Sequence, residues 1–344
     1  MSAKHDVRFE ALRVLAALSI FLAHFLGDLS ARGDTRFSVW GSPLAAFGIN
    51  AFIAVSGAML VLHGTRVTER GYAQQVRLRL GKLLPMYWFV AIPFIVLALV
   101  THRLTSAELW KIPLWLTGLG WIRADTFWPV VDAWWYMSIA IQIVLVGPLL
   151  VAGIRRYGWM VVGVVAALSD VTVRVALAQA HLPWVMNGII VSYAAVLVAG
   201  GALVEIASRL RAEDMRGATA PSLVLLYCGL AMLVTGRTAE LSALVGIAVA
   251  LAVPSPSGVR WQRALIVAGA LTYPFYLSHS PFAKVALGLG QPLGIPLLAI
   301  LLADLAIAVV IAAAFSAAFR FLQAQGARKP VGVLSGAGAP AKED

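Results

Sequence analysis

Two polar residues in the first apolar segment have types and a spacing that suit acid–base chemistry beside an anion site. Arg13 and His24 lie eleven positions apart. At about 100° per residue, this spacing ends about 20° past three full helical turns, so both side chains leave one face, roughly 16 Å apart along the axis. Arginine binds phosphates, and histidine, with an unperturbed pKa of about 6.5, can accept a proton from a hydroxyl. The alternatives are an arginine that reaches lipid phosphate and a histidine with a structural hydrogen bond.

Three more polar residues occur in apolar segments at a similar expected depth: Asn50, Gln142 and His279. Counting about 1.5 Å per residue, both histidines lie roughly 20 Å from the side on which the chain begins, and the two amides lie about 10–12 Å from the opposite side. A polar group at membrane depth is costly and is a functional candidate by default. This shared level predicts a buried polar cavity.

Other polar residues suggest chemistry less directly. Asp170 and Arg174 are four residues apart and are expected to pair on one helix face, whereas Asp304 has no obvious partner. Ser56 and Ser278 could form a covalent intermediate, but neither lies in a recognisable nucleophile motif. The six histidines are dispersed without paired ligand spacing, so no metal site is expected.

A basic cluster precedes the third apolar segment, where Arg77, Arg79 and Lys82 come before Pro85. Proline is tolerated in the first turn of a helix, so a helix can begin here. The cations either mark the cytoplasmic side of the membrane or bind phosphate groups.

These residues must be positioned by helices in a membrane. Of the 344 residues, 60% are apolar and 12% are charged, about half of the roughly 25% that is usual in soluble domains. The single cysteine excludes an intrachain disulfide. The net charge of +11 comes from scattered residues, which argues against nucleic-acid binding. The composition predicts an all-α polytopic membrane protein.

A spanning helix needs about 20 mostly apolar residues. Ten runs meet or approach this length, which predicts a bundle of about ten transmembrane helices; they are residues 11–29, 43–63, 83–101, 134–153, 158–179, 184–205, 220–236, 239–254, 264–286 and 294–318. We interpret the first run as a retained helix and not as a signal peptide. An N-in, C-in orientation puts 18 basic residues inside against 8 outside, as the positive-inside rule requires.

Two regions lie outside these runs. The segment 102–133 and the two residues after it contain six of the eleven tryptophans. They are expected to form an interfacial aromatic belt or a stacking platform for a sugar-like acceptor. Residues 326–344 are expected to be a disordered cytoplasmic tail, which leaves 1–325 as one membrane domain.

Four segments together resemble the acyltransferase-3 family of integral membrane acyltransferases, which modify bacterial surface glycans. They are RFEALRVLAALSIFLAHF (8–25), GINAFIAVSGAML (48–60), RLRLGKLLPMYW (77–88) and LTYPFYLSHSPF (271–282). Arg13 and His24 have the family's arginine–histidine spacing, while Lys82 and Thr272 stand where arginine and serine are usual. Ala140 stands where many members have glutamate, which puts any chemistry of that carboxylate in doubt. No soluble hydrolase-like domain of the kind that some members carry is expected after the helices.

The resemblance implies a membrane O-acyltransferase that moves an acyl group, most often acetyl, from cytoplasmic acyl-CoA to a hydroxyl of a cell-surface polysaccharide or its lipid-linked precursor. It implies a multi-pass protein of the bacterial inner membrane, acyl-CoA as a donor substrate, no permanently bound cofactor, and other glycan-assembly proteins as partners. The CoA phosphates would be held by Arg13, Arg77, Arg79 and Lys82.

In this scheme His24 is the general base, and His279 is a second base or holds the acceptor. The developing oxyanion would be stabilised by Asn50, Gln142 or Tyr276. The alternative function is a solute or proton-coupled transporter with the same polar layer, although we find no internal repeat and no paired broken helices. A non-catalytic scaffold leaves the buried polar layer without a reason.

Overall fold

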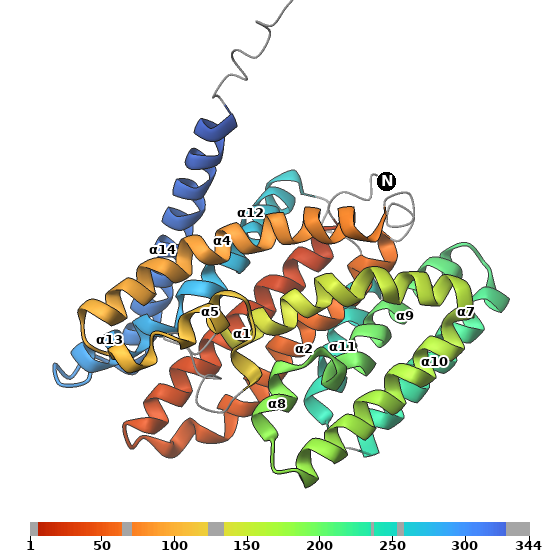
Figure 1. Cartoon of the computed structure of the whole chain (residues 1–344), viewed down its shortest axis with the longest axis horizontal. Coiled ribbons are helices and arrows are strands. Elements are labelled where there is room, and N and C mark those ends of the chain that lie inside the picture. Colours follow the sequence, from red (N-terminus) through yellow and green to blue (C-terminus); the bar gives the residue numbers. More distant parts are fainter. Residues whose placement is uncertain (1–5, 64–70, 123–133, 235–236, 253–257, 328–344) are drawn as a thin grey trace, which may run out of the picture.

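The computed structural model describes residues 6–63, 71–122, 134–234, 237–252 and 258–327. Within them every regular element is helical, which confirms the all-α class (Figure 1). The α-helices are α1 (Val7–Ala31), α2 (Ser38–Leu62), α4 (Tyr72–Val100), α5 (Lys111–Leu116), α7 (Trp135–Gln179), α8 (Pro183–Gly188), α9 (Ala194–Arg211), α10 (Met215–Val234), α11 (Thr238–Ala252), α12 (Val259–Ser278), α13 (Ser280–Gly290) and α14 (Leu297–Ala327). Short 3₁₀ turns are η1 (Thr35–Phe37), η2 (Ser106–Glu108), η3 (Gly120–Ile122) and η5 (Ile190–Tyr193). The predicted tail lies almost wholly outside the described residues.

Seven helices in the described part of the chain are long and apolar enough to cross a membrane, so the expected count of about ten is not confirmed. The fourth and fifth runs are the two helical arms of α7, which is counted as one long helix although the helix is interrupted at Gly158, where φ is 81°. The eighth run forms α11, a helix of only 15 residues. The ninth is divided at His279 into α12 and α13. The N-in, C-in orientation stays a prediction.

Helices α1 and α2 form the centre of the bundle, with α9 and α11 beside α2 (Figure 1). The packing of α2 on α9 depends on glycine. A Cβ on Gly57 would overlap the carbonyl group of Leu197, and a Cβ on Gly200 would overlap the backbone of Ala54. Small residues at such positions let membrane helices approach closely.

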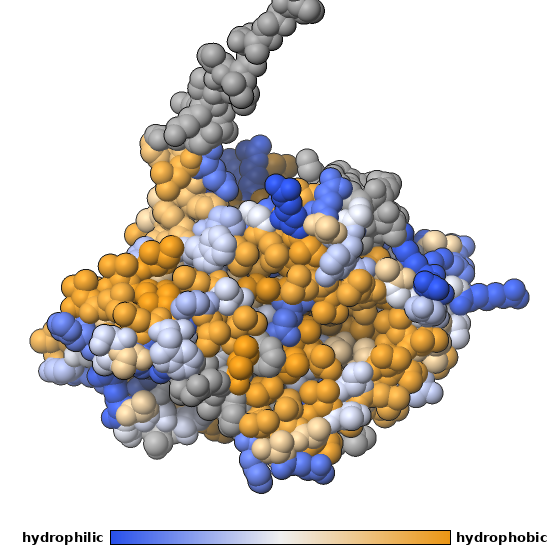
Figure 2. Space-filling view, viewed as in Figure 1, coloured by the Kyte–Doolittle hydropathy of each residue, from blue (hydrophilic) through white to orange (hydrophobic). Residues whose placement is uncertain are grey.

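The outer face of the bundle is largely apolar (Figure 2). Along α4, for example, Ile92, Val96 and Val100 are half or more exposed. Exposed apolar surface on this scale is not found on soluble monomers. Together with the seven long apolar helices, it indicates a multi-pass membrane protein.

The predicted pair of Asp170 and Arg174 is confirmed, with Arg174 Nε 2.8 Å from Asp170 Oδ1. The structure adds two partners that the sequence did not indicate. Arg237 Nη1 lies 2.7 Å from the fully buried Asp170, and Arg237 Nε lies 2.6 Å from Glu240. Both arginines also donate to the carbonyl oxygen of Ser192. This buried network of four charged residues fastens η5 to α7 and α11.

Candidate active site

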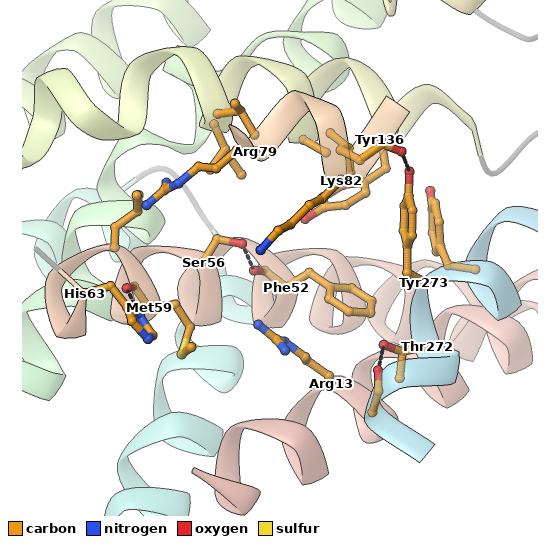
Figure 3. Close-up of a pocket in the computed structure, with 17 residues that line it drawn as sticks. Arg13, Phe52, Ser56, Met59, His63, Arg79, Lys82, Tyr136, Thr272 and Tyr273 are labelled. Carbon is orange, nitrogen blue, oxygen red and sulfur yellow. Dashed lines mark hydrogen bonds between the residues drawn. The ribbon is translucent and has the colours of Figure 1, made fainter. Parts of the chain in front are cut away.

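A cavity of about 560 Å³ lies between α1, α2, α4, α7 and α12 (Figure 3). We call it the cationic cavity because Arg13, Arg79 and Lys82 extend into it from two helices. Its other lining residues are Phe52, Ser56, Met59, Leu60, His63, Leu83, Tyr136, Ala140, Ile143, Val144, Gly269, Thr272, Tyr273 and Tyr276. No acidic side chain is among them, so the cavity suits an anionic ligand.

The structure separates the four predicted phosphate ligands. Arg13, Arg79 and Lys82 line the cationic cavity, whereas Arg77 is exposed and does not. Arg13 Nη1 lies 3.0 Å from Glu10 Oε1 just behind the cavity wall. Within the described ranges, Arg79 and Lys82 form no ion pair. Their charges are therefore available to a bound anion.

The two predicted catalytic histidines come from helices far apart in the sequence, yet their rings are neighbours. The ring centroids of His24 and His279 are 5.2 Å apart. His279 lies between α12 and α13, two residues before Pro281. Proline cannot donate a helical hydrogen bond, so the break follows from the sequence. Phe275 stacks on the His279 ring at 5.5 Å with an interplanar angle of 11°.

The hydrogen bonds of His279 fix its tautomer. Its Nδ1 lies 2.9 Å from the carbonyl oxygen of Tyr276 and 3.2 Å from that of Phe275. Because a carbonyl oxygen only accepts, Nδ1 must carry the proton and Nε2 must be an acceptor. The side chain is 1% exposed, and Nε2 has no hydrogen-bond partner in the part of the chain described. The Nε2 atom is therefore available to accept a hydrogen bond from an N–H or O–H group.

A second cavity of about 340 Å³ lies on the other side of the histidine pair. Its walls come from the last two turns of α1 and the first two turns of α2, so we call it the α1–α2 cavity. It is lined by Ala23, His24, Leu26, Gly27, Ser30, Ser38, Gly41, Ser42 and Ala45. The cationic cavity contacts the opposite halves of these two antiparallel helices.

Ring contacts connect the two cavities. Tyr276 lines the cationic cavity, and its ring centroid lies 5.9 Å from that of His279. His279 in turn contacts His24, which lines the α1–α2 cavity. A substrate group located between the two cavities would therefore lie close to an imidazole ring.

The two predicted amide groups line neither cavity. Asn50 is buried, and its Nδ2 donates to the carbonyl oxygen of Ala46 at 2.7 Å. Gln142 Nε2 donates to the carbonyl oxygen of Gly188 at 2.7 Å, and its Oε1 accepts from the N–H of Ile190 at 3.0 Å. Gln142 thus anchors the irregular segment between α8 and α9 to α7.

The two serines considered as nucleophiles both donate to backbone. Ser56 Oγ donates to the carbonyl oxygen of Phe52, and Ser278 Oγ donates to that of Pro274. A nucleophilic serine is normally hydrogen-bonded to a base. In the described residues, neither hydroxyl has a histidine or carboxylate partner among its hydrogen bonds.

Two of the tryptophans in the predicted belt or platform are core residues. Trp115 and Trp134 are 5% and 2% exposed. Trp134 Nε1 donates to the carbonyl oxygen of Leu277, and the Tyr87 hydroxyl donates to that of Trp115. Trp134 therefore supports the segment that carries His279, and neither of the two buried rings is available as a platform. Residues 123–133 lie outside the described ranges.

Sequence reasoning missed His63, which follows the last residue of α2 and lines the cationic cavity (Figure 3). Its Nδ1 lies 2.9 Å from the carbonyl oxygen of Met59, so Nδ1 donates and Nε2 is the acceptor. The signal was present in the sequence. Ser56 and His63 are seven residues apart, which places both on one helix face.

Comparison with known proteins supports the resemblance seen in the sequence. The family model described as an acyltransferase domain, the acyltransferase-3 model, matches residues 6–319. No curated protein and no solved structure matches the chain. The match spans the cationic cavity, both histidines and the α1–α2 cavity. The chain therefore belongs to the acyltransferase-3 family and is a membrane acyltransferase.

Proposed function

We propose that this protein transfers an acyl group, most simply acetyl, from cytoplasmic acyl-CoA to a hydroxyl of a cell-surface polysaccharide or its lipid-linked precursor in the bacterial inner membrane. The observation that carries the proposal is the placement of paired imidazoles between two cavities of different chemistry. One cavity is lined by three cations, and the other has no charged wall residue apart from the histidine.

The cationic cavity would take the donor. Arg79 and Lys82 form no ion pair with the described residues, and guanidinium and ammonium groups bind phosphate oxygens strongly. With the N-terminus inside, Arg13 lies in the cytoplasmic half of α1, on the side from which CoA arrives. The exposed Arg77 would then attract the anion without holding it.

His24 would act as the base. It takes the proton of the acceptor hydroxyl while that oxygen attacks the thioester carbonyl. The new C–O bond forms, the C–S bond breaks, and the imidazolium returns the proton to the CoA thiolate. The Nε2 acceptor of His279 would receive the other ring N–H of His24 and so orient the base. Tyr276, which lines the cationic cavity beside His279, would donate to the developing oxyanion.

The proposal is tested with permeabilised membranes, labelled acetyl-CoA and the host glycan. His24→Asn should lower transfer by about 10²–10⁴-fold, the usual contribution of a general base. His102→Asn is the matched control, because His102 is exposed and lines neither cavity. Asparagine also tolerates the φ of 54° at that position.

Protein level must be equal in all membranes. Full transfer by the His24 variant would overturn the assignment of the base. If the wild-type protein instead moves a solute across vesicles without consuming acetyl-CoA, the protein is a transporter and the proposal fails.

A further inference from the structure

The glycines between α1 and α2 fall into two groups. Gly48 is required for packing, because a Cβ there would overlap Ile20 and the carbonyl oxygen of Ala16. Gly27 and Gly41 have no such requirement. A Cβ on Gly27 would meet nothing within 4 Å, and one on Gly41 would meet only the carbonyl oxygen of Ala23, at 3.7 Å. Both positions line the α1–α2 cavity.

Glycine inside a helix costs about 1 kcal/mol relative to alanine. Close helix packing compensates for this cost at Gly48, but nothing in the packing does so at Gly27 or Gly41. Because Gly27 and Gly41 carry no side chain, the volume beside His24 stays empty. The cavity is thus an open space that the sequence maintains, with a candidate base in its wall.

The wall also indicates the chemistry of the occupant. Ser30, Ser38 and Ser42 supply hydroxyl groups, and His24 is the only titratable residue among the lining residues that the structure describes. Hydroxyls donate and accept hydrogen bonds, but they do not compensate a buried charge. At about 340 Å³, the space is at the lower end of the roughly 300–1,000 Å³ of small-molecule sites, so it suits a small sugar unit and not a long oligosaccharide.

We propose that the α1–α2 cavity binds the acceptor as a single uncharged, hydroxyl-bearing sugar ring, and that Gly27 and Gly41 keep it open for that ring. This inference rests on the proposed acyltransferase function. Sugar residues that carry a carboxylate or phosphate are disfavoured in this cavity, because its described wall holds no lysine or arginine.

The test uses substitutions that narrow the α1–α2 cavity. The KM is then measured separately for the glycan and for acetyl-CoA. Gly27→Val and Gly41→Val are expressed in the native membrane, with Gly229→Ala as the control. Gly229 is on α10, and a Cβ there would meet only Leu241, at 3.9 Å. We expect the KM for host glycan to rise at least about tenfold in both valine variants. The KM and the binding of labelled acetyl-CoA should equal those of wild type and control.

The chemistry of the site is read from the product. Mass analysis of the acetylated glycan should locate the new ester on an uncharged sugar residue. An ester on a uronic acid or a phosphorylated residue would overturn the inference, as would valine variants with an unchanged KM for glycan or an equally raised KM for acetyl-CoA. Failure of the proposed function itself gives a different result, since the wild-type membranes would then transfer no acetyl group.

Discussion

Gly269 of α12 leaves the space that the carboxylate of Glu10 occupies on α1. A Cβ at position 269 would overlap Glu10 Oε2, while Glu10 Oε1 holds Arg13 at 3.0 Å. The Glu10 side chain is only 10% exposed, so the carboxylate has little room to move. The absence of a side chain at Gly269 therefore fixes the position of Glu10, and Glu10 in turn positions Arg13 in the cationic cavity.

Gly269→Ala should weaken donor binding by displacing Glu10 and with it Arg13. We expect the KM for acyl-CoA to rise about three- to tenfold, which corresponds to part of one charge-assisted hydrogen bond. Steady-state kinetics in membranes measure the change, with the KM for glycan as the internal comparison. An unchanged donor KM in a normally expressed variant would show that Glu10 does not position Arg13.

Substitutions of Arg79 and Arg77 should differ in their effect on the KM for the acyl donor. Arg79→Gln removes a cation that lines the cavity, so the donor KM should increase about tenfold or more. Arg77→Gln is the matched control two residues away, and its exposed side chain predicts a change of less than about threefold at physiological ionic strength. Equal effects of the two variants would contradict the assignment of the cationic cavity as the donor site.

Gln142→Leu should lower stability before it affects chemistry. The substitution leaves the N–H of Ile190 and the carbonyl of Gly188 without their partner. Each unsatisfied buried group costs about 1–3 kcal/mol. Thermal unfolding in detergent should begin at a lower temperature, while the donor KM of the remaining folded protein stays the same. Gln179→Leu, at the exposed end of α7, should leave the melting temperature nearly unchanged.

The buried charge network should be far more sensitive than a surface ion pair. Arg237→Met removes the partner of Glu240 and one partner of Asp170, and breaking a buried pair costs about 3–5 kcal/mol. Arg209→Met breaks two ion pairs of a side chain that is 46% exposed, where about 0–1 kcal/mol is expected. Melting temperatures in detergent compare the two. Similar shifts would mean that the network around Asp170 is not holding η5 in place.

Several features of the fold could be predicted because they depend on local composition. The all-α class follows from the scarcity of charge. The pairing of Asp170 with Arg174 follows from their spacing, whereas the break before α13 falls inside the run 264–286 that was expected to be continuous. The number of long helices was predicted less well. The helical stretches on either side of Gly158 correspond to the two expected runs 134–153 and 158–179, whereas the division of the ninth run at His279 was not expected.

The sequence by itself determined that Arg13 and His24 share one face of a membrane helix, because the helical period fixes that relationship. Only the tertiary structure decided that His279 lies beside His24, that Gln142 binds backbone, and that Arg77 does not line the cavity that Arg79 lines. The reason is physical. The period of a helix is set by neighbouring residues, whereas the face that it turns toward another helix depends on how the side chains of both pack.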